Sequence, residues 1–531
     1  KTIIVNSLDK IDIMPIRMVP DENKGQNKQR NTPRNNQNTG GGGGLIKILA
    51  MALPFLLKKP KLLLLIAVIG GIWYFMGDGC SLAPVADNSE QQHSDLTRGA
   101  DLDPDEFDKA EVFEPLAEKS NNTLPERVSL EKYCPPRQNQ GYQGSCVGWA
   151  SSYAARTILE AKRTGKNPNQ VAFSPSSLYN QIALKDCQGA YINQAMDVMR
   201  SQGVLPWRDF PYDENSCSAK PRDPKMRNYV TKGYNRLTVT DNPRSDIDLM
   251  AMKQNLAQGA PVVIGMMVGG SFMQGMQGQD VWRPSRNDYN MRGFGGHAMC
   301  VIGYDDYKAG GSFQIMNSWG KEWGRNGIGW VTYDDMKFFT KEAYGLYPMG
   351  DANKAVSNKF EMAFGLVAND GGEYIPIKQV SGNYFETSGA IPKGTRFKLE
   401  VANSLECYTY IFGAETDNRS YVLFPYTAKH SPYCGITGTR VFPKDHSLMA
   451  DQEGSKDYFA ILITKQPIEY TNVNKALNRT AGNTYAQKIN NTLGEVLKKN
   501  VRFQGNGQNI GFSTDTNGEE AVLMIIGVNK R

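Results

Sequence analysis

One apolar run near the N-terminus limits how this 531-residue chain can fold, because it is suited to a bilayer and not to water. Residues 62–76 read LLLLIAVIGGIWYFM, which with its flanks is near the short limit of about 17 to 25 residues for a bilayer-crossing helix. Lysines precede the run and acidic residues follow it, so the positive-inside rule puts the preceding residues in the cytoplasm. We therefore predict a single N-terminal transmembrane helix in a membrane segment that covers residues 45–77.

The flanks of the membrane segment are polar. Residues 1–44 contain few aromatic residues and end in a run of glycines, which is typical of a disordered tail, here on the cytoplasmic side. Residues 78–122 are acidic and weakly periodic, as in a linker. Two alternatives stay open: residues 45–57 could form an interfacial helix or half of a re-entrant hairpin, and the apolar run could belong to a cleaved signal peptide. Its depth in the chain and the lack of a small-residue cleavage site favour a retained anchor.

The bulk composition indicates a multidomain globular protein beyond these segments. A chain of this length exceeds what one core organises, and we predict two folded regions, residues 123–351 and residues 352–531. The net charge is +6, with much of the excess before residue 62, and no dense Lys/Arg stripe indicates nucleic-acid binding. The sequence has no Cys/His spacing of the metal-binding type, so we expect no metal and no cofactor.

A glycine-containing turn followed by a helical pattern marks Cys146. Residues 140–150 read QGYQGSCVGWA, and the apolar residues of the next stretch recur at helical spacing. Cys146 is therefore predicted at or just before a helix N-terminus. That position lowers the pKa of a thiol, as does a neighbouring imidazolium, so that the nucleophilic thiolate is populated near neutral pH.

A histidine and an asparagine downstream complete a candidate catalytic set. His297 lies at the start of an apolar strand, and Asn317 ends the strand that follows. The Asn317 side-chain carbonyl could accept a hydrogen bond from the second imidazole nitrogen, and Trp319 could shield that bond from water. A nucleophile, a base and an orienting group are the parts of a generalised catalytic triad.

These motifs, in this order, resemble the papain family of cysteine peptidases over most of residues 130–350. The motifs are QGYQGSC, GGHAMCVIGYDD and NSWGKEWGRNGIGWV. The resemblance implies an α+β fold of two lobes, one helical and one like a β-barrel. It also implies four catalytic roles: Cys146 as nucleophile, His297 as base, Asn317 as orienting group and Gln140 as oxyanion-hole donor.

The resemblance further implies a peptide substrate and residues that hold it. Backbone groups would pair with an extended substrate, and the second subsite would prefer apolar side chains. Cys187 and Cys217 match one of the family's disulfides, which agrees with an oxidising compartment. The residues implied for substrate binding are Gly189, Ala190, Tyr191, Ala298 and Trp319.

Departures from the family pattern also bear on the site. Gln143 stands where a second cysteine is usual, so the corresponding disulfide is absent. Ala190 replaces a common glycine, which could narrow the cleft. Residues 81–122 contain no inhibitory prosegment of the family's helical type, so zymogen control has no support in the sequence.

Residues 352–531 show short alternating runs separated by glycine and proline turns, which is typical of an antiparallel β-sandwich. A helix is expected between residues 473 and 500 and a last strand over residues 521–528. The region resembles a bacterial accessory domain of unknown function, which implies no chemistry of its own. Cys407 and Cys434 could form a disulfide or stay two buried free thiols.

The predicted function is that of a membrane-anchored cysteine endopeptidase, which hydrolyses peptide bonds through a thioester on Cys146. We expect a single-pass protein of the bacterial inner membrane, with the peptidase in the periplasm or outside. The alternatives are a processing or transpeptidase component, or an inactive scaffold, of a cell-envelope assembly that binds partners through residues 352–531. The expected partners are a peptide or protein substrate, the membrane through residues 45–77, and an envelope protein, with no nucleic acid.

Overall fold

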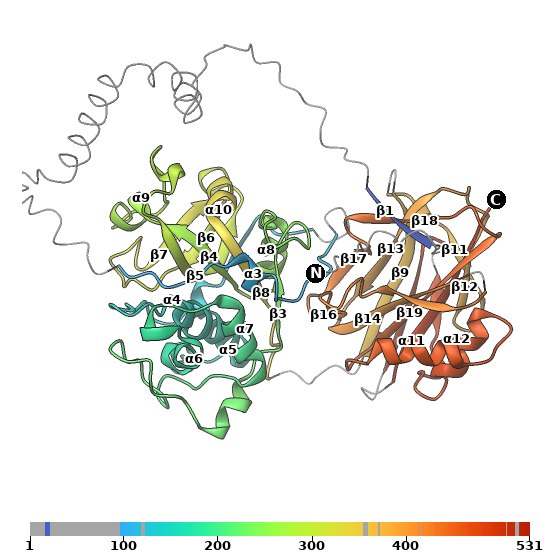
Figure 1. The fold of residues 1–531 in the computed structure, drawn as a ribbon, viewed down its shortest axis with the longest axis horizontal. Coiled ribbons are helices and arrows are strands. Elements are labelled where there is room, and N and C mark those ends of the chain that lie inside the picture. The colour runs from blue at the N-terminus through green and yellow to red at the C-terminus, as the bar shows by residue number, and fades with distance from the viewer. Residues whose placement is uncertain are drawn as a thin grey trace, which may run out of the picture. The chain divides into compact units, whose positions relative to one another are not determined.

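The computed structural model describes residues 16–21, 96–117, 123–353, 359–369, 372–415, 417–505, 507–515 and 520–531 (Figure 1). Residues 45–77, which are predicted to be the membrane segment, lie outside these ranges. Within them, no helix is both long enough and apolar enough to span a bilayer.

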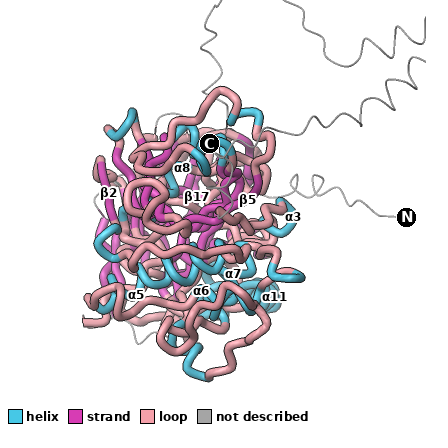
Figure 2. The backbone as a smooth tube through the Cα atoms, turned by 90° about the vertical axis from the view of Figure 1, so that its left-hand side faces the viewer, coloured by secondary structure: helices cyan, strands magenta, loops and turns pink. Residues whose placement is uncertain are grey.

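The first folded region has a helical half built around the helix that Cys146 begins. α4 (Cys146–Gly148) continues through a π-helical segment (Trp149–Arg156) into α5 (Thr157–Thr164). α5 ends at a glycine in the left-handed conformation, which is a common helix stop because glycine has no Cβ. α6 (Pro175–Ile182) and α7 (Ile192–Ser201) contact this helix, and α5, α6 and α7 lie together in Figure 2.

The second half of this region is a seven-stranded sheet in the order β3-β8-β4-β5-β6-β7, with β2 paired to β5. β5 (Gly295–Asp305) is antiparallel to β4 (Val262–Val268) and β6 (Ser312–Met316), and these strands are almost completely buried. A helical half and a β half confirm the predicted two-lobed α+β architecture. The remaining elements are β2 (Arg127–Ser129), β3 (Tyr234–Arg236), α8 (Leu249–Ala257), α9 (Gly270–Gln274), β7 (Ile328–Thr332), α10 (Tyr333–Phe339) and β8 (Thr340–Leu346).

The described residues after 358 form two β-sheets around a separate apolar core, as predicted. One sheet has the order β1-β18-β13-β9-β21-β20, in which β1 (Ile16–Pro20) comes from the N-terminal part of the chain, and the other has the order β11-β12-β22-β19-β14-β15. The described strand pairs are antiparallel except for β12 with β22. The strands are β9 (Lys359–Ala368), β10 (Tyr374–Ile375), β11 (Ile377–Ser381), β12 (Tyr384–Thr387), β13 (Arg396–Asn403), β14 (Cys407–Ala414), β15 (Ser420–Phe424), β16 (Tyr433–Cys434), β17 (Gly438–Phe442), β18 (His446–Ala450), β19 (Lys456–Thr464), β20 (Phe503–Gly505), β21 (Asn509–Asp515) and β22 (Val522–Asn529).

Two helices, α11 (Tyr470–Arg479) and α12 (Tyr485–Leu493), pack on the second sheet where one helix was expected. The chain breaks between them because Thr484 caps α12, its side chain accepting a hydrogen bond from a backbone N–H in the first turn. Cys407 and Cys434 lie opposite one another in the β14–β16 pair as free thiols.

Strand β1 (Ile16–Pro20) differs from the disordered tail that the sequence predicts over residues 1–44; the rest of that tail, apart from Asp21, lies outside the described residues. β1 pairs antiparallel with β18, with Met18 opposite Leu448, and so extends the first sheet at its edge. Asp21 follows it and accepts hydrogen bonds from Lys398 Nζ at 2.6 Å and from Ser447 Oγ at 2.6 Å. The backbone ladder of a sheet edge needs little side-chain signal, so the sequence pattern did not reveal this strand.

Candidate active site

Cys146 lies at the start of α4, as the sequence predicts, and its side chain has no solvent exposure. The turn before it is held by Tyr212. The Tyr212 hydroxyl donates to the Gln140 carbonyl at 2.7 Å and lies 2.7 Å from Ser145 Oγ. These bonds fix the loop that presents the sulfur at the helix N-terminus.

His297 and Asn317 come together from neighbouring strands. His297 Nε2 lies 2.8 Å from Asn317 Oδ1, and the Trp319 ring stacks on the imidazole with 4.2 Å between centroids. Ser318 N–H donates to the same amide oxygen at 2.8 Å, which fixes the orientation of the Asn317 amide. Because this oxygen can only accept, Nε2 carries the proton and Nδ1 is the basic nitrogen. Nδ1 has no hydrogen-bond partner among the described residues.

Cys146 and Gln140 lie beside this pair. The N–H of Ala298, the residue after His297, points at the Cys146 sulfur at 3.4 Å. Gln140 Oε1 accepts from Ser318 Oγ at 2.7 Å, and its Nε2 donates to the Gln143 carbonyl at 2.9 Å. Nε2 has two hydrogens, so one can serve a further acceptor such as an oxyanion.

A segment of the chain itself, residues 97–102, lies across these groups, and we refer to it as the cleft segment. On the helical side, Ala190 N–H donates to Gly99 O at 2.9 Å, and Asp101 N–H donates to Ala190 O at 3.1 Å. This bridge is parallel. The cleft segment therefore uses the backbone groups of Ala190 that are predicted to hold an extended substrate.

The cleft segment is also bonded to the β half. Ala100 N–H donates to Gly296 O at 3.2 Å, and Trp319 Nε1 donates to the Thr97 carbonyl at 2.8 Å. Arg98 Nη1 donates to the carbonyls of Gly293 at 2.8 Å and Val268 at 3.0 Å. The segment thus bridges both lobes on either side of the sulfur.

Gly99 lies against Gly144, in the turn that precedes Cys146. Its N–H, together with those of Ala298 and Val147, donates toward the sulfur. A Cβ added at Gly99 would lie only 2.1 Å from the Gly144 carbonyl oxygen, so only glycine fits there. The Gly99 N–H donates to Gly296 O at 3.3 Å and also acts to lower the pKa of the thiol, so the segment covers the thiol with a backbone donor.

Leu102 fills a pocket in the β half. A Cβ added at Gly265 would lie 2.4 Å from Leu102 Cδ2 and 3.0 Å from Ile192 Cδ1, so the missing side chain makes the room. Glu342 lies behind this position and is only 3% exposed. Its Oε2 accepts from the Tyr344 hydroxyl at 2.9 Å, and burial raises its pKa to about 8.

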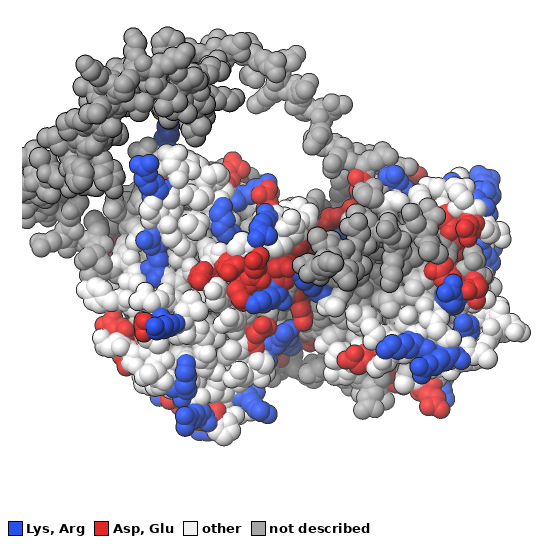
Figure 3. Space-filling model, in the orientation of Figure 1, with Lys and Arg blue, Asp and Glu red and all other residues white. Residues whose placement is uncertain are grey.

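The acidic residues that follow anchor the cleft segment. α3 (Pro104–Phe107) buries Phe107, and acidic side chains gather over this helix in Figure 3. Asp108 pairs with Arg236 at 3.2 Å and with Lys429. Residues 81–122 lack a helical prosegment of the family's type, so the sequence does not predict zymogen control. The structure differs, since the blocking segment is short, extended and held by backbone bonds.

The closed cleft also changes the electrostatics of the thiol and the imidazole. Burial raises the pKa of Cys146 to about 12, although backbone N–H donors oppose this. Burial, together with the nearby Arg98 charge and against the Asn317 hydrogen bond, lowers the pKa of His297 to about 4. A neutral thiol therefore faces a neutral imidazole. Displacing the cleft segment would return water to both groups and remove Arg98, which favours the thiolate–imidazolium pair.

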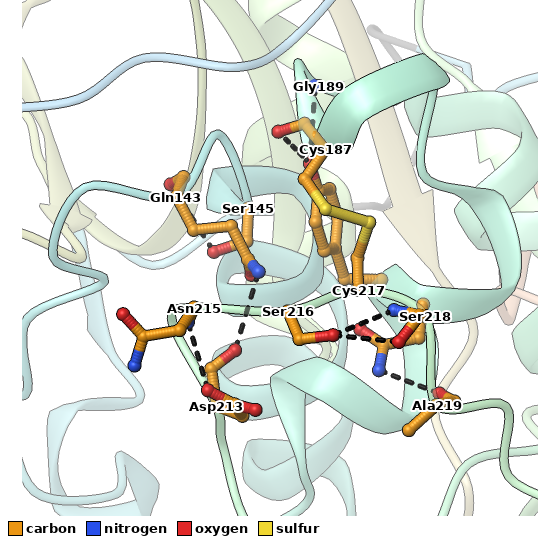
Figure 4. Close-up of a disulfide and its surroundings, with 12 residues drawn as sticks. Gln143, Ser145, Cys187, Gly189, Asp213, Asn215, Ser216, Cys217, Ser218 and Ala219 are labelled. Atoms are coloured by element: carbon orange, nitrogen blue, oxygen red, sulfur yellow. Dashed lines mark hydrogen bonds between the residues drawn. A yellow bond between two sulfur atoms is a disulfide. The ribbon is translucent and has the colours of Figure 1, made fainter.

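The predicted disulfide between Cys187 and Cys217 is present, and it lies beside the turn that carries Gln143 and Ser145 (Figure 4). Gln143 Nε2 donates to the Asp213 carbonyl at 3.3 Å, in place of the disulfide that the family has at that position. Tyr179 links the disulfide to the backbone next to Ala190. Its hydroxyl donates to Cys187 O at 2.7 Å and accepts from Gly189 N–H at 3.2 Å.

Removal of the disulfide is expected to destabilise this half of the domain. It closes a loop of sequence separation 30, for which chain entropy gives about 3 to 4 kcal/mol. We expect the Cys187→Ser, Cys217→Ser double variant to lose that much free energy of unfolding in urea titrations. Cys134→Ser, which changes a buried thiol outside any disulfide, is the matched control. Equal losses in both variants would contradict a role for the cross-link.

The structure brings the sequence-predicted residues into one site. His297 contacts Asn317 and Trp319 directly, Cys146 is reached by the N–H of Ala298, and Gln140 is joined to the residue after Asn317 through the Ser318 hydroxyl. Gly189 and Ala190 lie on the same cleft, and Tyr191 precedes α7. The sequence reasoning missed the cleft segment and Glu342. Neither carries a periodic signal in the sequence. The one available signal was Glu342 itself, a single glutamate in the mostly buried strand β8, which could have indicated the pocket that Leu102 fills.

Part of the chain is similar to known proteins. Residues 124–345 match the family model described as "Papain family cysteine protease". An uncharacterized peptidase C1-like protein of Acanthamoeba polyphaga mimivirus is 30% identical over 221 residues, which cover 39% of this chain and 64% of that protein. Cathepsin K of Mus musculus is 28% identical over 230 residues, covering 40% and 64%. The chain thus spans less than two thirds of these relatives. The crystal structure of xylellain, a cysteine protease from Xylella fastidiosa, is 24% identical, with a TM-score of 0.36 over 44% of this chain and 91% of that one.

Proposed function

Because residues 124–345 belong to the papain family of cysteine proteases, we propose that this chain is a latent cysteine endopeptidase. Cys146 is the nucleophile, His297 the base, Asn317 the orienting group and Gln140 the oxyanion donor. The observation that carries the proposal is the contact of 2.8 Å between His297 Nε2 and Asn317 Oδ1, beside a thiol at a helix start. This contact leaves Nδ1 as the nitrogen that can take the thiol proton.

The proposed chemistry follows from these four side chains. Nδ1 of His297 takes the Cys146 proton as the sulfur attacks the scissile carbonyl carbon. Gln140 Nε2 and the Cys146 N–H then donate hydrogen bonds to the oxyanion. The imidazolium gives its proton to the leaving amine, and a thioester forms. Water, deprotonated by the same nitrogen, attacks the thioester and releases the acid.

An extended peptide is the substrate class that fits the backbone groups around the sulfur. The backbone N–H and C=O of Ala190 and the backbone C=O of Gly296 can each form a hydrogen bond with such a peptide. In the closed structure, the cleft segment occupies these three groups. The pocket filled by Leu102 accepts an aliphatic side chain, which supports an apolar preference at the corresponding position of the substrate. Hydrolysis therefore requires that the cleft segment leave first.

Glu342 is expected to extend this preference to basic side chains. A substrate arginine that enters the Leu102 pocket would bring a guanidinium to a buried carboxylate, which would ionise in response. We expect Glu342→Gln to lower kcat/KM for an arginine substrate about tenfold, while kcat/KM for the leucine analogue changes less than about twofold. Paired fluorogenic peptides that differ only at this position would measure both values. Equal losses for both peptides would mean that Glu342 supports the fold and not the specificity.

Active-site labelling of the full chain tests the proposal. An epoxide probe for thiolates is added, and intact mass is followed over time for the wild type, Cys146→Ala and His297→Ala. We expect slow labelling of the wild type and none of either variant. Labelling that does not need His297 would contradict an activated thiolate. Labelling without hydrolysis of any peptide in a diverse library would contradict the peptidase function.

The proposed location is the bacterial inner membrane, with attachment through residues 45–77 and the peptidase on the periplasmic side. The apolar sequence of residues 62–76 supports the attachment, and the Cys187–Cys217 disulfide supports an oxidising compartment. The β-sandwich is the proposed contact for an envelope protein. Membrane fractionation and protease protection of the peptidase in intact spheroplasts would test both.

A further inference from the structure

Strand β18 would form the edge of the first sheet of the β-sandwich if β1 did not cover it. On one side β18 pairs with β13, and on the other side it pairs with β1 along five residues. Among the described strands, β1 pairs with β18 alone. An edge strand offers its N–H and C=O groups to any extended chain, and such main-chain bonds give affinity whatever the side chains are.

One side chain of β1 reaches the apolar core of the sandwich. Met18 lies opposite Leu448 in the ladder and is partly buried against that core. Residues that lie directly opposite in an antiparallel pair share a face of the sheet, and Leu448 is almost completely buried. The β18 edge therefore accepts an apolar side chain at this position of an added strand.

Three donors receive the carboxylate that follows the added strand. Lys398 Nζ and Ser447 Oγ each donate to Asp21 at 2.6 Å, and Asn369 Nδ2 donates to it at 3.1 Å. Lys398 is only 8% exposed, and Ser447 is fully buried. Burial acts to raise the pKa of Asp21, but the hydrogen bonds from Lys398 and Ser447 hold it below its usual value. The donors lie on β13, on β18 and just after β9, so the sandwich itself builds this carboxylate site.

The fold also fixes the ammonium group of Lys398. Its Nζ donates to the carbonyls of Pro443 at 3.1 Å, Lys444 at 2.6 Å and His446 at 2.8 Å. The exposed Asp445 also acts on Lys398 through its charge. A cation held in this way presents a charge-assisted hydrogen bond to the carboxylate that ends an added strand.

We propose that the β18 edge binds an extended segment of another protein of the cell envelope, with an apolar side chain opposite Leu448 and an aspartate directly after the strand. In this structure β1 fills that site. Main-chain pairing provides the affinity, and the apolar position and the carboxylate site provide the specificity. This inference rests on the envelope contact proposed for the β-sandwich, and it is independent of the reaction of Cys146.

Fluorescence anisotropy with a labelled, amidated peptide IRMVPD, which copies residues 16–21, tests the proposal. The host is the full chain with Asp21→Lys, in which the charge of Lys398 repels β1 and opens the edge. We expect saturable binding to this variant, and at least tenfold weaker binding to the wild type, where β1 competes. The peptide IRMVPN should bind the variant at least tenfold more weakly than IRMVPD, because it lacks the charge that Lys398 meets.

Asp515→Lys is the matched control. It makes the same change of charge at the end of β21, which β9 and β13 separate from β18 in the same sheet. This variant should bind IRMVPD no more tightly than the wild type does. If Asp21→Lys does not fold, the wild type with excess peptide carries the test, and it must show the same preference for IRMVPD over IRMVPN.

Three outcomes would overturn the proposal. They are equal binding of the two peptides, no binding of IRMVPD to any folded host, and a wild-type dimer that Asp21→Lys dissociates, which would place β1 on a second copy. The membrane fractionation and protease protection that test the proposed location do not involve the β18 edge, so the two proposals can fail separately.

Discussion

Substitution of Gly99 by valine is expected to raise peptide hydrolysis about 100-fold. Any Cβ at this position would lie 2.1 Å from the Gly144 carbonyl oxygen and 2.4 Å from its carbon, and backbone atoms cannot move aside as a flexible side chain can. Overpacking of this kind costs about 1 to 3 kcal/mol. It destabilises only the closed state, in which the cleft segment covers Cys146. A loss of about 3 kcal/mol there multiplies the open population about 100-fold while the open state is still rare.

Initial rates on a fluorogenic leucine peptide, together with the rate of Cys146 alkylation, measure this effect. Both rates should rise together, because both need an open cleft. Gly389→Ala is the matched control, since a Cβ there meets nothing within 4 Å and its φ is not left-handed. If Gly99→Val left both rates at the wild-type level, the cleft segment would not be the inhibitor.

Replacement of Cys146 by alanine in the Gly99→Val protein is expected to lower kcat by at least about 10⁴. Removal of a nucleophile leaves only binding and oxyanion stabilisation, and such losses in related chemistry are of that order. Intact mass should show no acyl or probe adduct, and peptide hydrolysis should fall to background. The Cys146 thiol forms only a weak hydrogen bond with the Ala298 N–H, so its loss should hardly change the free energy of unfolding.

A second cysteine variant separates nucleophile loss from a general thiol effect. Cys300→Ala removes another buried free thiol, which lies three positions after His297 on β5 but outside the hydrogen bonds described for the site. In the Gly99→Val protein, Cys300→Ala is expected to retain hydrolysis within about threefold. Activity that persists in the Cys146→Ala protein would assign the reaction to another group.

Side-chain chemistry decided how much of the site could be predicted. Cys146, His297 and Asn317 each occur in a motif whose residue types have few other uses together, so their meeting could be foreseen across a sequence separation of 152 between Ala298 and Cys146. The cleft segment could not be foreseen. It acts through the backbone N–H and C=O groups of Gly99 and Asp101, which every residue possesses.

In residues 352–531, local patterns predicted the strands but not how all of them pair. Alternating apolar residues predicted the strands, because their period is set by the pleat of each strand alone. The parallel pairing of Phe385 with Ile526 joins strands that are far apart in the chain, and no local pattern encodes such a partner. The division of the expected helix depended on one cap at Thr484.

Strand β1 restricts how this chain can be threaded through a lipid layer. β1 precedes the apolar run at residues 62–76, and its partner β18 follows that run. If the run crossed a bilayer once, the two strands would face different aqueous compartments, and one molecule could not join them. The β1–β18 pairing and the single crossing expected from the sequence therefore exclude one another within one molecule.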